Sequence, residues 1–442
     1  MMNRRQALRR MAGAVAIPVA GAGAAARPNI LLLLADDHGM RYAGCYGNRA
    51  VRTPNIDRLA NEGLRCTGAF TGTAMCAPSR SMLFTGLYPH RNGAHPNHSS
   101  VRPGIPTLPA RLSDLGYTVA LAGKRHVAPP AAFPFEYLSL EETGSFLARR
   151  HARPFCLVVA TNDPHTPFKK LPPGQGFSPA DVWLPPSLVD TPETRQEMAA
   201  YYNSVASLDR QVGQCLDALR KHGLEERTFV VYTSDHGAEF PFSKWTLYDA
   251  GLNVPFMVRH PGRIRPGSVA GAMFSFVDVL PALIEIAGGK PPQSLDGRSL
   301  LPVFHGRREH RPIIFGTHTN TGIISGSDYP IRAVRTRTHK YIRNFNPEET
   351  FTNVTTNGGW KGVQDDPPDY WKSWVRRAET DAFARQRVTA YQHRPPEELY
   401  DLRLDANEMR NLAPEDSHRD VLSRLRQQLR DWMRRQSDPL CE

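Results

Sequence analysis

The chain has 442 residues, a formal net charge of +12 and 40% hydrophobic residues, which is enough for a large packed core. Charged residues make up 22% of the chain, and this balanced composition excludes a disordered or fibrous protein. The basic residues are scattered, without the aromatic ladder or recognition motif of a nucleic-acid-binding protein, and no apolar run is long enough to span a bilayer. We therefore expect a globular protein with neither a nucleic acid nor a membrane as its partner.

The first 26 residues have the features of an export signal. Two arginine pairs, at positions 4–5 and 9–10, precede an apolar run, and Ala24–Ala26 offers a small-residue cleavage site. The first pair resembles the twin-arginine pattern, although Ala7 stands where a bulky aromatic residue is usual. We expect residues 1–26 to be an export signal peptide that is cleaved, leaving a periplasmic or secreted protein.

From residue 29 onward, apolar runs alternate with amphipathic stretches. The continuous run Asn29–Leu34 predicts a central strand buried on both faces. Thr53, Pro54 and Gly63 mark the N-cap, the first turn and the C-cap of a helix. Further strands are predicted at Tyr117–Leu121, Phe155–Ala160, Phe229–Thr233 and Pro255–Val258, and a long helix at Thr194–Arg220. This alternation predicts an α/β protein with a doubly wound, mostly parallel sheet.

The composition changes between Pro302 and Pro312, which suggests a catalytic α/β domain over residues 27–305 and a smaller α+β subdomain over residues 306–442. In the second part, Ile331–Arg337 and His339–Arg343 predict a two-stranded ribbon, and residues 345–394 are expected to be irregular. A further strand is predicted at 398–402 and an amphipathic helix at Arg419–Arg435. This closing segment is a candidate homodimer contact.

Four of the predicted strands end in polar clusters: Asp36-Asp37-His38, Lys124-Arg125-His126, Asn162-Asp163-Pro164-His165 and Ser234-Asp235-His236-Gly237. In open α/β sheets, ligands bind beyond the carboxyl ends of the strands. Two adjacent carboxylates and a third acid suit a hard cation with oxygen ligands. The sequence therefore predicts an active site, with a metal, at this edge of the sheet.

The segment Cys76-Ala77-Pro78-Ser79-Arg80 places a cysteine at the start of a predicted helix, where backbone N–H groups favour an anion. Extended to Gly86, it resembles the first signature of the type I sulfatases. Residues 116–126 resemble the second signature, with Val119 where serine or threonine is usual. The resemblance implies an alkaline-phosphatase-like fold and oxidation of Cys76 to formylglycine by a formylglycine-generating enzyme.

The segments between these motifs resemble the sulfamidase branch of that family: residues 123–127, 133–137, 162–165, 247–248, 329–334, 398–401 and 438–441. This resemblance implies a hydrolase that removes the N-sulfate of glucosamine in heparin or heparan sulfate fragments. Two alternatives stay open. One is a sulfatase for a 6-O- or aryl-sulfate ester, and the other is a phosphonate or phosphate monoester hydrolase of the same superfold.

The resemblance also implies a divalent metal, whose ligands would be Asp36, Asp37, Cys76, Asp235 and His236. Calcium is the metal implied by the family. However, His236 stands where sulfamidases carry asparagine, and imidazole suits manganese, iron or zinc better than calcium. Manganese or another transition metal is therefore the alternative.

The catalytic roles follow from the same resemblance. The hydrated formylglycine would attack sulfur, and Arg80 and Lys124 would balance the charge on the nucleophile and the sulfate oxygens. His126 would take the proton of the second hydroxyl, and His165 and Lys244 would lie on the leaving-group side. Lys244 replaces an arginine of the sulfamidases, whereas other sulfatases carry lysine there.

Overall fold

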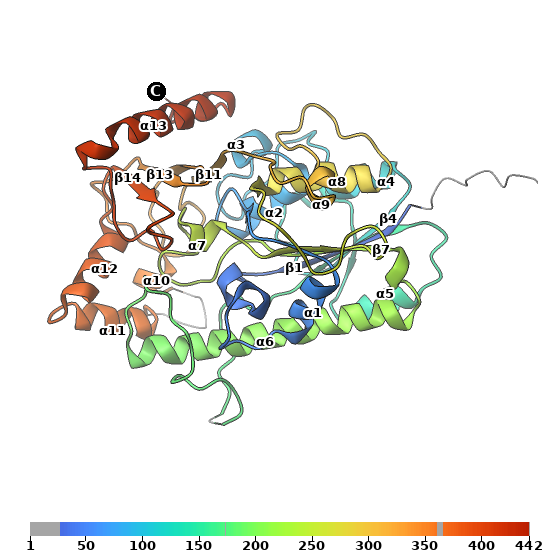
Figure 1. Ribbon diagram of the computed structural model, residues 1–442, viewed down its shortest axis with the longest axis horizontal. Coiled ribbons are helices and arrows are strands. Elements are labelled where there is room, and N and C mark those ends of the chain that lie inside the picture. Colours follow the sequence, from blue (N-terminus) through green and yellow to red (C-terminus); the bar gives the residue numbers. More distant parts are fainter. Residues whose placement is uncertain (1–26, 173, 360–365, 442) are drawn as a thin grey trace, which may run out of the picture.

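The computed structural model describes residues 27–172, 174–359 and 366–441 (Figure 1). The export signal predicted for residues 1–26 lies outside the described residues. Among those that are described, no helix is long and apolar enough to cross a membrane.

A mixed eight-stranded sheet runs through the centre of the molecule in the order β5-β4-β6-β1-β7-β8-β2-β9. The first five strands in this order are parallel, β8 is antiparallel to both of its neighbours, and β9 is parallel to β2. The bounds are β1 Asn29–Ala35, β2 Leu64–Cys66, β4 Thr118–Gly123, β5 Glu136–Leu138, β6 Phe155–Ala160, β7 Thr228–Ser234, β8 Phe256–Arg259 and β9 Ser268–Ala270.

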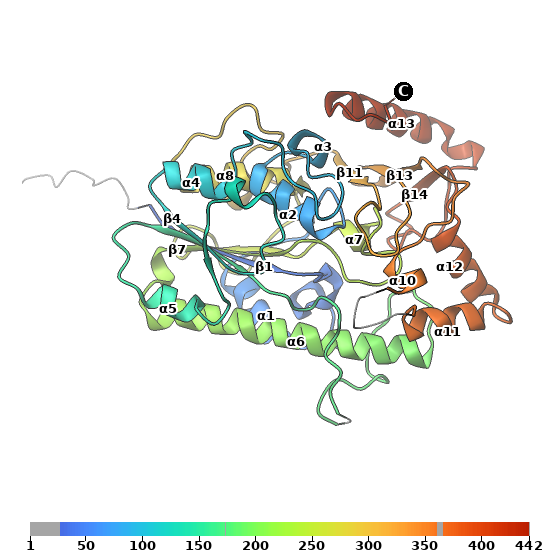
Figure 2. The same ribbon diagram turned by 180° about the vertical axis from the view of Figure 1, so that it is seen from behind.

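Strand β1 shows why the sheet carries helices on both faces. Its side chains alternate between two apolar clusters, with Ile30 and Leu32 in one and Leu31 and Leu33 in the other. In Figures 1 and 2, α1, α5 and α6 lie on one side of the sheet, and α2, α4 and α8 on the other. The helices of this part are α1 Pro54–Glu62, α2 Cys76–Thr85, α3 Pro89–Asn92, α4 Leu108–Asp114, α5 Thr143–Ala148, α6 Pro192–Lys221, α7 Asp249–Leu252, α8 Val279–Ile286 and α9 Leu301–Phe304.

A second, antiparallel sheet lies at one end of the molecule in the order β11-β12-β13-β14 (Figure 2). Helix α13 contacts two of its strands. The bounds are β11 Ile314–His318, β12 Ile331–Arg335, β13 His339–Asn344, β14 Glu397–Asp401, α10 Val354–Asn357, α11 Asp369–Arg377, α12 Ala382–Gln392 and α13 Arg419–Arg435. A short pair, β3 Ala69–Phe70 and β10 Phe274–Ser275, completes the strands.

The predicted fold class is confirmed: a large, mostly parallel sheet between helices is joined to a smaller α+β part. Two details were wrong. The predicted two-stranded ribbon is the middle of a four-stranded sheet, because β11 and β14 pair with its outer edges. Residues 345–394 are not irregular, since they contain α10, α11 and α12. The domain boundary near residue 305 stays a prediction.

A third apolar cluster joins the two parts. It contains Tyr201 of α6, Trp245 from the loop after β7, Ile331 of β12 and Trp374 of α11, all of them buried. The indole N–H of Trp374 donates a hydrogen bond of 2.8 Å to the hydroxyl of Thr194 on α6. The smaller part therefore packs against the larger part, including the loop that follows β7.

Candidate active site

The four polar clusters predicted from the sequence meet at one edge of the large sheet. They follow β4, β6, β1 and β7, which are consecutive neighbours and run parallel. Their carboxyl ends therefore point the same way, as the topology of an open α/β sheet requires. The site residues Asp36, Lys124, His165 and Asp235 come from these four ends.

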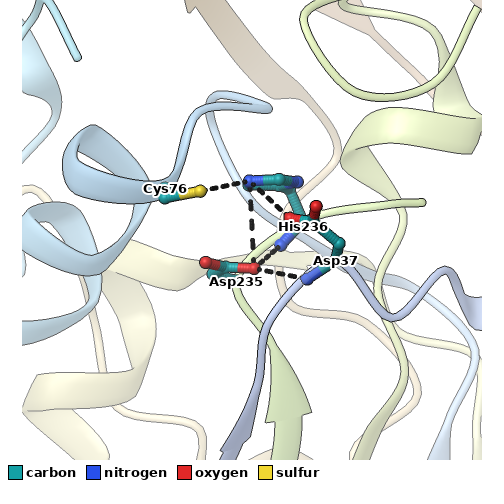
Figure 3. A group of neighbouring side chains, drawn as sticks. All are labelled: Asp37, Cys76, Asp235 and His236. Carbon is teal, nitrogen blue, oxygen red and sulfur yellow. Dashed lines mark hydrogen bonds and ion pairs between the residues drawn. The ribbon is translucent and has the colours of Figure 1, made fainter. Parts of the chain in front are cut away.

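Cys76 reaches the same place from helix α2. It is the first residue of that helix and is 2% exposed, and its sulfur points toward His236 (Figure 3). The distance from Cys76 Sγ to His236 Nε2 is 3.3 Å. One turn later, Arg80 is fully buried. The helix thus places the thiol and the guanidinium on the same side, because residues four apart share a helix face.

Four side chains form a compact group of potential metal ligands. Asp37, Cys76, Asp235 and His236 each offer one ligand atom, and these atoms all lie within 4.8 Å of one another. His236 Nδ1 lies 3.0 Å from the carbonyl oxygen of Gly237, which leaves Nε2 facing the group. In Figure 3, the two carboxylates approach from the ends of β1 and β7.

This group fits a divalent cation. Asp37 Oδ1 is buried without a hydrogen-bond partner among the described residues, and it lies 3.4 Å from His236 Nε2. A buried carboxylate oxygen without a donor carries a large desolvation cost, which a cation offsets. Two carboxylates and an imidazole form a mixed oxygen and nitrogen donor set.

Asp36 lies beside this group and not within it. Its Oδ1 accepts a hydrogen bond of 3.0 Å from Arg80, and its Oδ2 accepts one of 2.5 Å from Lys124. Burial raises the pKa of Asp36, as does Cys76, but the two cations outweigh both and hold the pKa below its usual range. Its role as a metal ligand stays a prediction, since both oxygens already have cationic partners.

Arg80 connects the two sides of the site. Besides Asp36, it donates a hydrogen bond of 3.0 Å to Asp235 Oδ2, and all three side chains are buried. A buried guanidinium between two carboxylates holds both in fixed orientations through its planar fork.

The thiol of Cys76 lies in a strongly positive environment. Burial alone raises its pKa, but Lys124, Lys244 and His236 outweigh burial and lower the pKa well below its usual value. His126 contributes to the lowering. The site is therefore built to hold a negative charge at the position of the Cys76 side chain.

Lys244 is buried between two carboxylates. Its Nζ donates hydrogen bonds of 2.7 Å to Asp37 Oδ2 and of 2.7 Å to Glu239 Oε2. The same Glu239 oxygen accepts a bond of 2.9 Å from the hydroxyl of Thr166, next to His165. Sequence reasoning missed Glu239. The signal available was an acid three residues after His236, within the same loop.

The predicted histidines lie on the rim of the metal group. His165 Nε2 is 3.9 Å from Asp37 Oδ2, and its Nδ1 is 2.6 Å from the carbonyl oxygen of Thr166. Burial lowers the pKa of His165, as does Lys244, but the carboxylate of Asp37 raises it to about 9. His126 Nε2 lies 3.0 Å from His98 Nδ1.

A hollow of about 500 Å³ is lined by Thr166, which follows His165 in the chain, and by Glu239, the hydrogen-bond partner of Lys244. Phe168 and Tyr370 of α11 are also part of its lining. Lys170 and Lys372 also line it, and they form ion pairs with carboxylates of the same lining: Lys170 with Glu197, and Lys372 with Asp366 and Asp369. This hollow is the candidate substrate pocket, because its lining includes a partner of Lys244.

Comparison with known proteins agrees with this geometry. The sulfatase family model matches residues 28–134 and 136–289, and the model for the C-terminal part of N-sulphoglucosamine sulphohydrolase matches residues 236–355. The chain belongs to the sulfatase family.

Two curated relatives and one solved structure illustrate the range of the likeness. An ulvan-active sulfatase of Formosa agariphila is 33% identical, over 94% of this chain and 82% of the relative. Human N-sulphoglucosamine sulphohydrolase is 32% identical, over 94% of this chain and 91% of the relative. A phosphonate monoester hydrolase of Agrobacterium radiobacter has the same fold, with a TM-score of 0.71 at 19% identity over 93% and 96% of the two chains.

Proposed function

We propose that this sulfatase hydrolyses the N-sulfate of glucosamine in heparin or heparan sulfate fragments. The observation that carries the sulfatase chemistry is the position of Cys76, at the start of α2 and within 3.3 Å of His236 in the candidate metal group. The choice of an N-sulfate is supported by the match of residues 236–355 to the N-sulphoglucosamine sulphohydrolase model. Those residues include Glu239, Lys244 and part of the candidate substrate pocket.

The nucleophile in this proposal is derived from Cys76. A formylglycine-generating enzyme oxidises the thiol to an aldehyde, which takes up water to give two hydroxyls on one carbon. The lowered pKa of the present thiol reflects the same surroundings that would stabilise a deprotonated hydroxyl at this position. We further propose that the protein is exported with cleavage of residues 1–26 and acts in the periplasm or outside the cell.

Asp37, Asp235 and His236 would hold the divalent metal, with Asp36 as a further candidate on the side of Arg80. A bound cation would polarise the sulfate and lower the pKa of the attacking hydroxyl. Calcium is the metal proposed by family, and manganese is the alternative because of the imidazole of His236.

The protein's own side chains would act on both sides of sulfur. Arg80 keeps Asp36 and Asp235 in place, and Lys124 would neutralise negative charge on the sulfate oxygens. His165 and Lys244 would lie on the leaving-group side, where the leaving amine would take up a proton; Thr166 and Glu239, their neighbours, line the pocket. His126, which contributes to the lowered pKa of Cys76, would accept the proton of the second hydroxyl when sulfate leaves.

The second candidate is a sulfatase for a sugar sulfate ester, such as a 6-O-sulfate. The relative that favours it is the ulvan-active sulfatase, which is as similar to this chain as the human enzyme is. Lys244 also departs from the sulfamidase pattern. Hydrolysis of a phosphonate ester is less well supported, because that relative shares the fold at 19% identity only.

Two sugars that differ in one bond test the substrate: glucosamine with a single N-sulfate and glucosamine with a single 6-O-sulfate. Sulfate release is measured for both, with protein whose Cys76 peptide has the lower mass of formylglycine. We expect a higher kcat/KM for the N-sulfate. Preference for the 6-O-sulfate would replace the proposed substrate by the second candidate and leave the chemistry unchanged.

A further inference from the structure

Five arginines surround one hollow at the outer edge of the large sheet, away from the candidate active site. The hollow measures about 770 Å³ and lies between β9, the loops beside it and the end of α9. Strand β9 is the last in the sheet order. The arginines are Arg263, Arg265, Arg307, Arg308 and Arg337.

None of these five arginines forms an ion pair with any described residue, although elsewhere in the described chain most buried and many exposed arginines do. All five are exposed. The only acid that lines the hollow is Glu309. So many unpaired guanidinium groups around one concave surface create a positive potential that attracts an anionic ligand.

The floor of the hollow is apolar. Val303 and Phe304 of α9 are buried beneath it, and Val269 of β9 is 55% exposed at its side. An apolar floor with a cationic rim suits a sugar ring that carries sulfate groups. The ring offers C–H surface to the floor, and each arginine fork can bind a sulfate through two parallel hydrogen bonds.

The strand register relates the hollow to the active site. Thr233 of β7 is paired with Phe256, which is paired with Cys66, which is paired with Ala270 of β9. Three strand spacings of 4.7–4.9 Å put β9 about 14 Å from β7, whose end carries Asp235. An oligosaccharide is long enough to cover such a distance, whereas a single sugar is not.

From these observations we infer that the hollow is a second binding site, which holds a sulfated stretch of a polysaccharide outside the catalytic pocket. The nature of the ligand rests on the proposed function, since the proposed substrate is a sulfated glycan. The presence of an anion site rests on the arginines alone.

Charge reversal at Arg265, Arg307 and Arg308 tests the inference. The triple variant R265E/R307E/R308E is compared with R150E/R153E/R424E, a control with the same change in net charge at three exposed arginines outside the hollow. Binding to immobilised heparin is measured at several salt concentrations. We expect the hollow variant to bind heparin at least about tenfold more weakly than the control does. Its affinity should also depend less steeply on salt, because fewer counterions are released. Equal affinity of the two variants would overturn the inference.

Two further probes identify the ligand. Fully desulfated heparin should bind the wild-type protein weakly, and double-stranded DNA should bind the two triple variants equally. A loss of DNA binding as large as the loss of heparin binding would overturn the assignment to sulfated glycans. The glutamine variant R265Q/R307Q/R308Q should show a smaller loss in the same direction, which guards against misfolding of the charge-reversed protein.

Hydrolysis separates this inference from the proposed function. Both triple variants should release sulfate from a monosaccharide at the wild-type rate, whereas KM for long heparin chains should rise only in the hollow variant. If the protein releases no sulfate from any glucosamine, the proposed function fails, but the comparison of heparin affinities still decides on the hollow.

Discussion

Lys244 is held between the carboxylates of Asp37 and Glu239, and these two bonds link the candidate metal group to the substrate pocket. Burial raises the pKa of Glu239, but the positive charges of Lys244 and His165 outweigh burial. The pKa of Glu239 therefore lies below its usual value. The ammonium group of Lys244 therefore has two negatively charged partners, Asp37 and Glu239. Without Glu239, Lys244 would pair with Asp37 alone and compete with the metal for that ligand.

We expect Glu239→Gln to lower kcat by about tenfold to a hundredfold, which corresponds to roughly 1.4 to 2.7 kcal/mol of transition-state stabilisation. The matched control is Glu197→Gln, because Glu197 lines the same pocket but lies 3.8 Å from Lys170, its one ion-pair partner among the described residues. Steady-state rates on the glucosamine N-sulfate measure both. Equal rates for the two variants would show that Glu239 does not position Lys244.

The choice of metal depends on His236. Replacing it by asparagine restores the residue that sulfamidases carry and removes a nitrogen ligand that favours transition metals. For His236→Asn we expect manganese affinity to fall by about tenfold or more, with calcium affinity unchanged or raised. Titration of chelated, metal-free protein with each cation measures this. A variant that keeps the wild-type order of affinities would show that His236 does not contact the metal.

The fold brings several of the predicted site residues together, but the sequence did not indicate every residue of the candidate site. Asp37, Cys76, Asp235 and His236 are brought together because each follows a predictable strand or begins a predictable helix. Glu239 could not be assigned in the same way. It lies in a loop whose path depends on packing against Tyr370 and Phe168, which are distant in the sequence.

At the scale of elements, prediction succeeded where the local pattern decides the structure. Strand Phe155–Ala160 and helix Arg419–Arg435 have the predicted bounds, because the strand is a continuous apolar run and the helix has an uninterrupted helical period. Helix α11 was missed, since its tryptophans and neighbouring prolines obscure the helical period. Its apolar face is defined by α6 and α12, against which it packs.

His318, at the end of β11, makes the smaller sheet sensitive to acid. Burial lowers its pKa to about 3. In the unfolded chain, the imidazole of His318 takes up a proton near pH 6.5. The contribution of the neutral, buried imidazole to the unfolding free energy is therefore complete above pH 6.5 and is lost as the pH falls toward 3. At pH 4.5 this loss amounts to about 2 to 3 kcal/mol of unfolding free energy.

We therefore expect His318→Gln to flatten the fall in unfolding free energy between pH 6.5 and 4.5. Urea denaturation at a series of pH values measures it, and His222→Gln, at an exposed histidine, is the control. An acid dependence as steep as that of the control would contradict the assignment.

At the scale of the whole molecule, the two parts of the chain share a core. Tyr201, Trp245, Ile331 and Trp374 belong to one apolar cluster, although they come from both parts of the chain. The loop that carries Glu239 and Lys244 lies against this cluster. The smaller part therefore packs against the loop that carries Lys244, and it also contributes Tyr370 to the lining of the candidate substrate pocket.

Because the core is shared, we expect the protein to unfold in a single transition. Far-ultraviolet circular dichroism and tryptophan fluorescence should give the same urea midpoint. Trp374→Ala should lower the unfolding free energy by about 3 to 5 kcal/mol. Both urea midpoints should therefore fall together. Separate midpoints for the two signals would indicate that the smaller part unfolds independently.

The central claim is that the side chain at position 76 becomes the nucleophile. The most direct test is sulfate release by Cys76→Ser and by wild-type protein purified together with a formylglycine-generating enzyme. Peptide mass and circular dichroism are recorded for both. We expect the wild-type peptide to show the lower mass of formylglycine and the protein to release sulfate, whereas the serine variant stays folded and releases none. Wild-type rates of sulfate release by the folded serine variant would contradict the claim.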